Sequence, residues 1–353
     1  MTIYDISKKA GVSIATVSRV INGSGKVSEK TRKKVLAVVE ESGYTPNLFA
    51  RGLGLNTMHI IGILCVDSSD LFLAKAVYYL EQKLYENGYG CLLCCTGYQQ
   101  ENKEKYMKLL LSKRVDACIL VGSSLVGQTL EDSRYIQDAA KEIPVMLLNA
   151  YLNGPNLYCV LADDYQATYA AADQLYRAGK RNLLYYYDSN SYSGKEKLRG
   201  FQDAMKANGV DKKEQKTLYY SGSREDIPSM KAKLAGLHQS GVTFDGIIAS
   251  DDNLALSAVK FAQSIGRKIP EEFAVIGYNN SLLAQCCEPE LTTIDNHLET
   301  LCSQLTATLM DVQGGKPAAS RMVFPCTLLP GGTTPALERM PEYSPQRKAT
   351  PAG

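Results

Sequence analysis

Residues 1–45 carry apolar side chains at the spacing of short helices. The first two apolar stripes each share one helical face, and they consist of Ile3, Ile6 and Ala10, then Val17, Val20 and Ile21. Between them, Gly11 permits a sharp bend of the backbone, and Ser13 is a good N-cap for the second helix. The pattern predicts two helices that meet at a tight corner, which is the helix-turn-helix arrangement.

A third helix is predicted over residues 27–43. Ser28 is its N-cap and Glu29 lies in its first turn, while Gly43 ends it. Its apolar stripe consists of Val35, Val38 and Val39. Three helices of this size predict one small hydrophobic core.

The polar side of the second predicted helix suits contact with nucleic acid. Its donors and acceptors are Thr16, Ser18, Arg19 and Asn22, which could reach base edges or phosphates. The alternative is a small amphipathic helix whose polar face meets only water. This segment alone does not decide between the two interpretations.

The distribution of charge favours contact with phosphate. Residues 1–58 hold nine Lys and Arg against four Asp and Glu, a net charge of +5, whereas the remainder of the chain has a net charge of −3. A basic segment followed by a mildly acidic one suits a nucleic-acid-binding domain joined to a domain with another task.

From Ile60 onward, short apolar runs alternate with amphipathic helical runs. The predicted strands are Ile60–Val66, Cys91–Cys95, Ala117–Val121, Val145–Leu148, Leu183–Tyr187, Gly246–Ala249 and Ala274–Gly277. The predicted helices include Leu71–Asn87, Asn102–Ser112, Ala167–Ala178, Lys195–Asn208 and Asn253–Ser264. This alternation predicts parallel sheets wrapped by helices, and the length fits two such sheets with a boundary near Val160–Ala162.

Three motifs in the first fifty-odd residues resemble one family closely. They are D-I-S-x-x-A-G-V-S-x-x-T-V-S-R-V-I-N from Asp5, V-S-x-x-T-R-x-x-V from Val27 and G-Y-x-P-N-x-x-A-R-x-L from Gly43. Together they resemble the signature of the lactose/galactose-repressor (LacI/GalR) family of transcriptional regulators. A weaker resemblance extends to about residue 340.

The resemblance implies an N-terminal all-α helix-turn-helix head and an α/β body of two parallel-sheet subdomains, like type I periplasmic binding proteins. The head would span residues 1–45 and a hinge helix or linker residues 46–59, with the ligand-binding and dimerisation core at 60–340. Within the core, one subdomain would comprise about 60–160 plus 293–325, and the other about 162–291 plus 326–340. The last crossings between them are expected near Leu291–Ile294 and Pro325–Leu328.

The family pattern also implies which residues would meet an operator. The major-groove set is Ile14, Ala15, Thr16, Ser18, Arg19 and Asn22, with Tyr4 and Ser13 as further DNA-binding residues, and the hinge set is Asn47, Arg51 and Leu53. Leu53 would enter the minor groove and bend the duplex. The chain departs from an ideal hinge at Gly52 and Gly54, each costing about 1 kcal/mol of helix stability relative to alanine.

Candidate effector residues follow the predicted strands, because ligands bind at the carboxyl ends of parallel strands. Ser68, Ser69, Asp70 and Phe72 follow the first strand, and Asn149 follows the fourth. By the family motifs R-x-x-G-F, N-D-x-x-A and G-Y-D-[DN], Lys197, Asp251 and Asn279 complete the set. The chain has no tryptophan, so a sugar face would stack on Phe72 or on a tyrosine, and the nearest tyrosines are Tyr98, Tyr151 and Tyr192.

These three matched positions depart from the sugar-binding pattern of the resembled family. Lys197 stands where arginine is usual, and Asp251 and Asn279 exchange asparagine and aspartate. One cation and one carboxylate are kept, but lysine offers a point charge in place of a bidentate fork. We therefore expect a small polar effector, a sugar or a sugar derivative, bound in a pose unlike that of the usual relatives.

Other functional classes find less support in the sequence. The N-terminus lacks the pattern of a secretory signal, and no apolar run approaches the ~20 residues of a membrane span, so a cytoplasmic protein without a membrane partner is expected. The ten cysteines are then expected to be thiols, and Cys91, Cys94 and Cys95 suit buried structural positions better than a metal site. No cofactor or metal is predicted.

Paired carboxylates raise the possibility of an enzyme. Asp163-Asp164 and Asp251-Asp252 are adjacent in sequence, but neighbouring residues at a helix start rarely converge on one substrate. Without a nucleophile elbow, P-loop or zinc motif, catalysis is not expected.

The sequence therefore predicts a ligand-responsive, DNA-binding transcriptional regulator, and a repressor is favoured. The polar, proline-rich residues 341–353 predict a disordered tail without leucine heptads, which favours a homodimer on a palindromic double-stranded operator. The alternative is a cytoplasmic sugar-sensing module whose head contacts another protein.

Overall fold

The computed structural model describes residues 2–21, 27–43 and 57–337. It contains two compact units: a helical head, formed by α1 to α3, and an α/β body that begins with β1. Among the described residues, no helix has the length and the apolar character needed to cross a membrane.

The head contains the three helices that the sequence predicts. They are α1 (Ile3–Ala10), α2 (Ile14–Ile21) and α3 (Glu29–Ser42). Gly11 and Gly43 end α1 and α3 in the left-handed conformation, with φ of 59° and 60°. The Ser13 and Ser28 hydroxyls accept hydrogen bonds from the backbone amides of Thr16 and Thr31 and so cap the starts of α2 and α3.

Five fully buried or nearly buried side chains form the core of the head. They are Ile6, Ala10, Val17, Val20 and Val35, one or two from each helix. The apolar stripes of the sequence thus meet one another, as expected. The polar faces of the helices are left outside this core.

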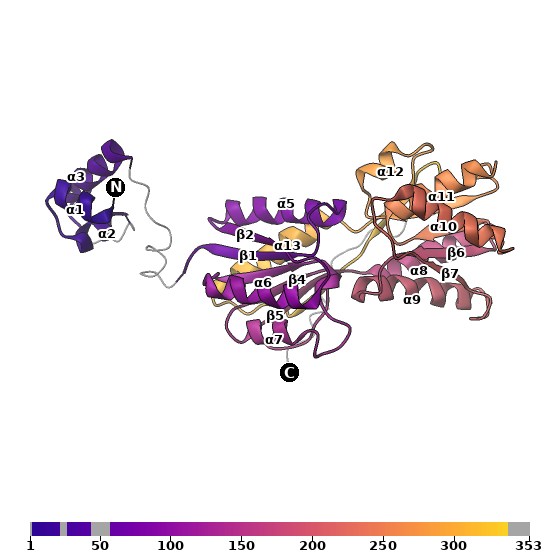
Figure 1. Cartoon of the computed structure of the whole chain (residues 1–353), viewed down its shortest axis with the longest axis horizontal. Helices are drawn as coiled ribbons and strands as arrows, with labels where there is room; N and C mark the ends of the chain where they lie inside the picture. Colours follow the sequence, from indigo (N-terminus) through magenta and orange to yellow (C-terminus); the bar gives the residue numbers. More distant parts are fainter. Residues whose placement is uncertain (1, 22–26, 44–56, 338–353) are drawn as a thin grey trace. The chain divides into compact units, whose positions relative to one another are not determined.

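The first subdomain of the body is a six-stranded sheet in the order β11-β5-β4-β3-β1-β2. Its strands are β1 (Ile60–Cys65), β2 (Gly90–Cys95), β3 (Ala117–Val121), β4 (Val145–Leu148), β5 (Leu157–Ala162) and β11 (Arg321–Phe324). Its helices are α5 (Leu71–Glu86), α6 (Gln100–Ser112), η1 (Ser123–Leu125), α7 (Arg134–Ala140) and α13 (Leu298–Gln313). Figure 1 shows α5 and α13 on one face of this sheet and α6 and α7 on the other.

The second subdomain repeats this plan with the order β12-β10-β9-β8-β6-β7. Its strands are β6 (Leu183–Tyr187), β7 (Lys216–Tyr219), β8 (Gly246–Ala249), β9 (Ala274–Tyr278), β10 (Thr292–Asp295) and β12 (Thr327–Leu329). Its helices are α8 (Asp164–Arg177), α9 (Tyr192–Ala207), α10 (Ile227–Gln239), α11 (Asp252–Ser264) and α12 (Leu282–Cys286). Helices α8 and α9 cover one face, and α10 and α11 the other (Figure 1).

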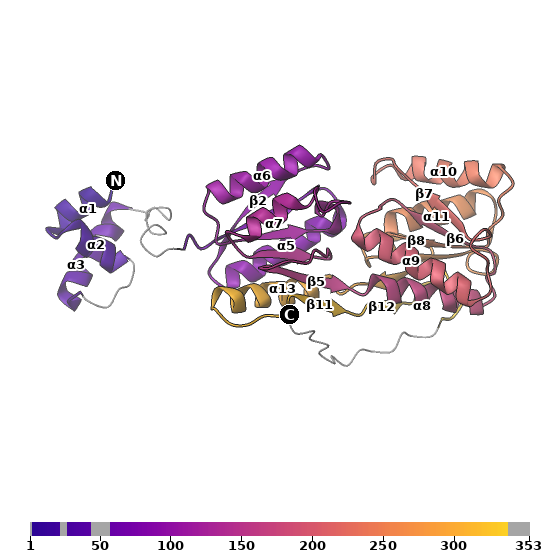
Figure 2. The ribbon, with the colours of Figure 1, turned by 90° about the horizontal axis from the view of Figure 1, so that it is seen from below.

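The pairing within the sheets is mainly parallel, as the alternation of strands and helices predicts. β1 pairs with β3, β3 with β4, and β4 with β5 in parallel, and the second sheet follows the same rule from β7 to β10. β12 is the exception, because it runs antiparallel to β10. Figure 2 shows α13, β11 and β12 along the side of the body where the chain passes between the subdomains.

The crossings differ in detail from the expectation. Thr292 pairs with Ile276, so β10 completes the second sheet before the chain returns, and the crossing expected near Leu291–Ile294 follows Asp295 instead. β11 and β12 lie in different sheets, so the last crossing passes through Pro325 and Cys326. β7 was not predicted, because the run Lys-Thr-Leu-Tyr is short and mixes polar with apolar residues.

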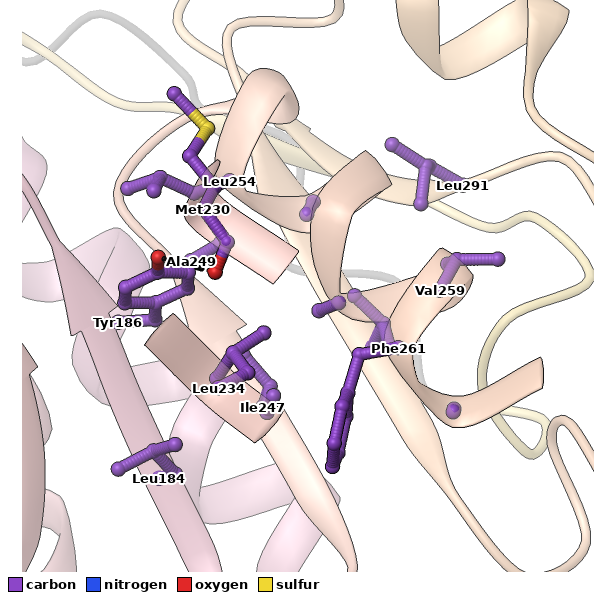
Figure 3. Close-up of a cluster of buried hydrophobic side chains, with 14 of the residues drawn as sticks. Leu184, Tyr186, Met230, Leu234, Ile247, Ala249, Leu254, Val259, Phe261 and Leu291 are labelled. Carbon is purple, nitrogen blue, oxygen red and sulfur yellow. Dashed lines mark hydrogen bonds between the residues drawn. The ribbon is translucent and has the colours of Figure 1, made fainter. Parts of the chain in front are cut away.

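One hydrophobic cluster of the second subdomain lies between its sheet and helices α10 and α11. Figure 3 shows Leu184, Tyr186 and Ile247 from the strands facing Leu234 and Phe261 from the helices. The Tyr186 hydroxyl donates a 2.9 Å hydrogen bond to the carbonyl of Met230, so a polar atom in this core is satisfied.

One expectation about the cysteines is wrong. Cys94 is buried, but Cys95 is exposed and Cys91 only half-buried, so the three do not all occupy core positions. The reason is topological: β2 is an edge strand, and one of its faces is open to solvent.

Candidate functional site

The first candidate site is the outer face of α2. Val17 and Val20 point into the core of the head, so the other side of the helix faces outward. Ser13, Ile14, Ala15 and Arg19 are exposed, while Thr16 and Ser18 are half-buried. Tyr4 is exposed at the start of α1. A short helix that presents polar and small side chains in this way can lie in a major groove.

Four residues of the predicted DNA-contacting set are not covered by the part of the chain that the structure describes. Asn22, Asn47, Arg51 and Leu53 lie outside the described residues, as do Gly52 and Gly54. The predicted hinge therefore remains a prediction from the sequence.

The second candidate site is a cavity between the two subdomains of the body. Five of the predicted effector residues line it: Phe72, Asn149, Lys197, Asp251 and Asn279. Ser69 and Asp70 line a larger groove that adjoins the cavity, and Ser68 lines neither. Most of the predicted set, drawn from the strand ends and from the family motifs, therefore lies around this cavity.

Lys197 is a buried cation in the wall of the cavity. It lies on α9, and its Nζ donates a 3.0 Å hydrogen bond to the carbonyl of Ser250. The same Nζ lies 3.4 Å from the ring centroid of Tyr278, a cation–π contact. Gly200, one turn further on, lets α9 approach α8 closely, since a Cβ there would lie 2.3 Å from the Tyr165 carbonyl oxygen.

Asp251 caps α11 and also faces the cavity. Its carboxylate accepts a 2.9 Å hydrogen bond from the amide of Leu254. Burial and the neighbouring Asp188 raise the pKa of Asp251 to about 7, although Arg224, the Leu254 amide and Lys197 act in the opposite direction.

The raised pKa makes a prediction about stability and pH. The folded state binds the Asp251 proton more tightly than the unfolded chain does, so this group stabilises the fold at low pH. Its contribution is lost as the pH rises from about 4 to about 7. The stability of Asp251→Asn relative to the unmodified chain should therefore increase as the pH is raised from about 4 to about 7, as measured by urea unfolding at several pH values. Parallel pH profiles of the two proteins would contradict this assignment.

Two charged residues that line the cavity, Asp188 and Arg224, were not among the predicted effector residues. Arg224 Nη1 lies 2.7 Å from Asp70 Oδ2, and Arg224 Nε lies 2.6 Å from Asp188 Oδ2. Burial lowers the pKa of Arg224, but Asp188, Asp251 and Asp70 together outweigh it and raise that pKa above its ordinary value. The cavity therefore holds two cations, Lys197 and Arg224, rather than one.

The sequence contained a signal for Asp188 but not for Arg224. Asp188 directly follows the predicted strand Leu183–Tyr187, so the same argument that selected Asn149 selects it as well. Arg224 lies in the loop after β7, and that strand was not predicted. Without that strand, the position of Arg224 at the carboxyl end of the sheet could not be predicted.

Direct hydrogen bonds join the two subdomains across the cavity. Ser123 donates to Ser191 over 2.7 Å, and Gln128 donates to the carbonyl of Asn190 over 3.0 Å. The Asp70–Arg224 ion pair also crosses between the subdomains. The structure thus describes a closed arrangement of the cleft.

The two asparagines of the cavity make hydrogen bonds within the protein. Asn149 Oδ1 accepts from the amide of Ala162 over 3.0 Å, and its Nδ2 donates to the Ser193 hydroxyl over 3.3 Å. Asn279 Oδ1 accepts from Asn296 over 3.1 Å. Both asparagines have positive φ, 52° and 93°, which asparagine tolerates better than most residues.

The tyrosines differ in their relation to the cavity. Tyr98 lines both the cavity and the adjoining groove. Tyr151 and Tyr192 pack against each other with ring centroids 5.8 Å apart and line neither space. Of the tyrosines proposed for stacking, only Tyr98 is placed where a ligand could reach it.

The adjacent carboxylates do not form a catalytic pair. Asp163 caps α8, while Asp164 accepts 2.5 Å hydrogen bonds from Ser193 and Tyr278. Asp252 points away from Asp251, accepting hydrogen bonds of 2.7 Å from the amide of Ser281 and the hydroxyl of Thr293. Each carboxylate has a structural task at a helix start.

Comparison with known proteins decides the family. Residues 2–47 match the family model "Bacterial regulatory proteins, lacI family", and residues 58–329 match "Periplasmic binding proteins and sugar binding domain of LacI family". The chain belongs to the LacI family. It is a DNA-binding transcriptional regulator, and the resemblance seen in the sequence motifs is confirmed.

Relatives along the whole length agree with this assignment. An "HTH-type transcriptional regulator" of Lachnoclostridium phytofermentans (strain ATCC 700394 / DSM 18823 / ISDg) is 51% identical over 95% of this chain and 99% of its own. The "HTH-type transcriptional regulator DegA" of Bacillus subtilis (strain 168) is 32% identical over 93% and 96%. These relatives are regulators and not enzymes, which confirms that catalysis is not the task of this LacI-family chain.

Solved structures support the same fold. A lac repressor dimer bound to operator and an anti-inducer has a TM-score of 0.84, with 21% identity over 95% of this chain and 99% of that one. A complex of the transcriptional regulator CelR with cellobiose has a TM-score of 0.67, with 25% identity over 94% and 99%. The LacI-family architecture of a helix-turn-helix head and two parallel-sheet subdomains is thereby confirmed.

Proposed function

We propose that this LacI-family chain is a homodimeric repressor whose affinity for a palindromic operator is changed by a small carbohydrate effector. The observation that carries the proposal is the cavity between the subdomains. There, Lys197, Arg224, Asp188 and Asp251 converge with serine hydroxyls from both sides. Convergent charged and polar groups in an enclosed cleft suit a small polar ligand.

The site suits a carbohydrate for two reasons. Its donors and acceptors are fixed by neighbouring groups, as Lys197 is by the Ser250 carbonyl, so they are preorganised for hydroxyl groups. The body matches a family model of sugar-binding domains, and a structural neighbour of 25% identity binds cellobiose. An effector that binds one degree of cleft closure better than another would shift that equilibrium, and with it the affinity for DNA.

A homodimer is supported by an exposed apolar surface on the first subdomain. Tyr78 and Tyr85 of α5 and Leu92 and Leu93 of β2 are all exposed, and α5 packs against β2. Exposed aromatic and apolar side chains on neighbouring elements suit a subunit interface. A two-fold dimer through this surface would provide two heads for the two half-sites of a palindrome. Such a regulator would act in the cytoplasm, where the operator DNA is found.

DNA recognition predicts a clear loss on substitution in α2. Arg19 is the long polar side chain among the outward residues of α2, and Ile14 and Ala15 can contact only thymine methyls or groove shape. Arg19→Ala should cost about 1–3 kcal/mol of specific binding. Fluorescence anisotropy with a selected operator duplex measures this, and Arg134→Ala, an exposed arginine on α7, is the matched control. Equal operator affinity of the two variants would contradict the proposed role of Arg19.

The proposal as a whole is tested by adding effector to the DNA titration. The full chain should bind the operator duplex with an affinity that falls steeply as salt rises, because counterions are released from phosphates. A sugar that binds the body should change that affinity. Operator binding without any response to a bound sugar would overturn effector control.

A further inference from the structure

The cleft between the subdomains is divided into an inner cavity and an outer groove. The inner cavity has a volume of about 80 Å³ and the outer groove about 850 Å³. Arg224 and Asp188 line both spaces, and Asp70, the ion-pair partner of Arg224, lines the groove. The cation–carboxylate cluster therefore stands at the boundary between them.

The inner cavity is the narrower of the two spaces while the ion pair is closed. A volume of about 80 Å³ leaves space for a few water molecules. Enlarging it requires the subdomains to separate, and the bonds that resist this include Asp70–Arg224, Ser123–Ser191 and Gln128–Asn190. A ligand that enters the cavity must therefore open these contacts and replace them.

The outer groove has the size and the side chains of a ligand site. Its volume of about 850 Å³ falls within the usual range of about 300–1,000 Å³ for small-molecule sites. Tyr98 from the first subdomain and Tyr219 from the second are 57% and 41% exposed there. Exposed tyrosine rings offer apolar faces to sugar rings and a hydroxyl for hydrogen bonding. Gln128 and Asn253 add amide groups to the same walls.

The charge of both spaces disfavours an acidic ligand. The lining cations are Lys197 and Arg224, and the lining acids are Asp67, Asp70, Asp188, Asp251 and Glu225. Arg224 already pairs with two of the carboxylates. A phosphate or carboxylate on the ligand would meet an excess of like charge.

We propose that the outer groove is a second sugar subsite, so that the effector is an uncharged oligosaccharide of at least two units. One unit takes the place of the Asp70–Arg224 contact beside Lys197 and Asp251, and the next unit lies in the groove against Tyr98 and Tyr219. This inference rests on the proposed effector binding and specifies its chemical class.

Calorimetric titration of the full chain with matched sugars tests the inference. The panel contains glucose, cellobiose, cellotriose and maltose, then xylose with xylobiose, galactose with lactose, and galacturonic acid with digalacturonic acid as acidic members. At least one neutral disaccharide should bind ten times or more tightly than each of its constituent monosaccharides. Tyr219→Ala should reduce that advantage about tenfold, whereas Tyr106→Ala, a tyrosine on α6 that lines neither space, should leave it intact.

Several outcomes would overturn the inference. They are a monosaccharide that binds as tightly as its disaccharide, preference for an acidic sugar, an unchanged advantage in Tyr219→Ala, or no binding by any member of the panel. A parallel titration with operator DNA separates this failure from failure of the proposed function. If the operator is bound and a monosaccharide alone changes its affinity, the regulator stands and only the second subsite is refuted.

Discussion

Replacing Lys197 with methionine should lower effector affinity by about 10- to 100-fold, because a hydrogen bond from a charged donor contributes roughly 1.5–3 kcal/mol. Methionine keeps the length of the buried side chain but removes the cation that lies against the Ser250 carbonyl and the Tyr278 ring. Asp188 and Asp251 would then share Arg224 as their remaining cation among the described lining residues. Calorimetry with the tightest-binding sugar measures the effect.

The control for this substitution lies on the same helix. Lys206 is exposed near the end of α9, so Lys206→Met should leave effector affinity within about twofold. Operator affinity should be kept in both variants. If Lys197→Met lost operator binding and thermal stability together, the cause would be misfolding, and an unchanged effector affinity would refute the role of Lys197.

Replacing Ile6 with alanine should remove operator binding and leave effector binding intact. Ile6 is fully buried in the head, and truncating a buried isoleucine costs about 2–5 kcal/mol. At roughly 0.05–0.15 kcal/mol per residue, a head of this size has only a few kcal/mol of stability to lose. The head should then be largely unfolded, and operator affinity should fall more than 100-fold.

A surface position in the head provides the comparison. Leu36 lies on α3 and is 47% exposed, so Leu36→Ala should change stability by less than about 0.5 kcal/mol. Anisotropy with operator DNA and calorimetry with a sugar measure the two functions separately. If Ile6→Ala still bound the operator, the three-helix core would not be required to keep α2 in its DNA-binding position.

Local signals in the sequence predicted most of the fold. Capping by Ser13 and Ser28, together with the left-handed glycines Gly11 and Gly43, marked the ends of the head helices within a residue or two. Buried strands such as Ala117–Val121 were predicted because a continuous apolar run that is too short for a helix is typical of a strand buried on both faces. β7, at an edge of its sheet, was missed because it alternates polar with apolar residues and has no such run.

The candidate effector site was predictable only in part. Lys197 and Asp251 were found through motif positions, and Asn149 through the rule that ligands lie at strand ends. Arg224 could not be found in this way, since its partners Asp70 and Asp188 lie far from it in the sequence and only the folded chain brings them together. Long-range ion pairs of this kind leave no local pattern.

The measurement that tests the central claim most directly is selection of bound sequences from random duplex DNA. The full chain is compared with a chain that starts at Ile60 and so lacks α1 to α3. The account predicts that the full chain alone recovers a palindrome, and that a sugar bound by the body changes the yield of that palindrome. Failure of the full chain to enrich any palindrome, with or without the sugars of the panel, would contradict it.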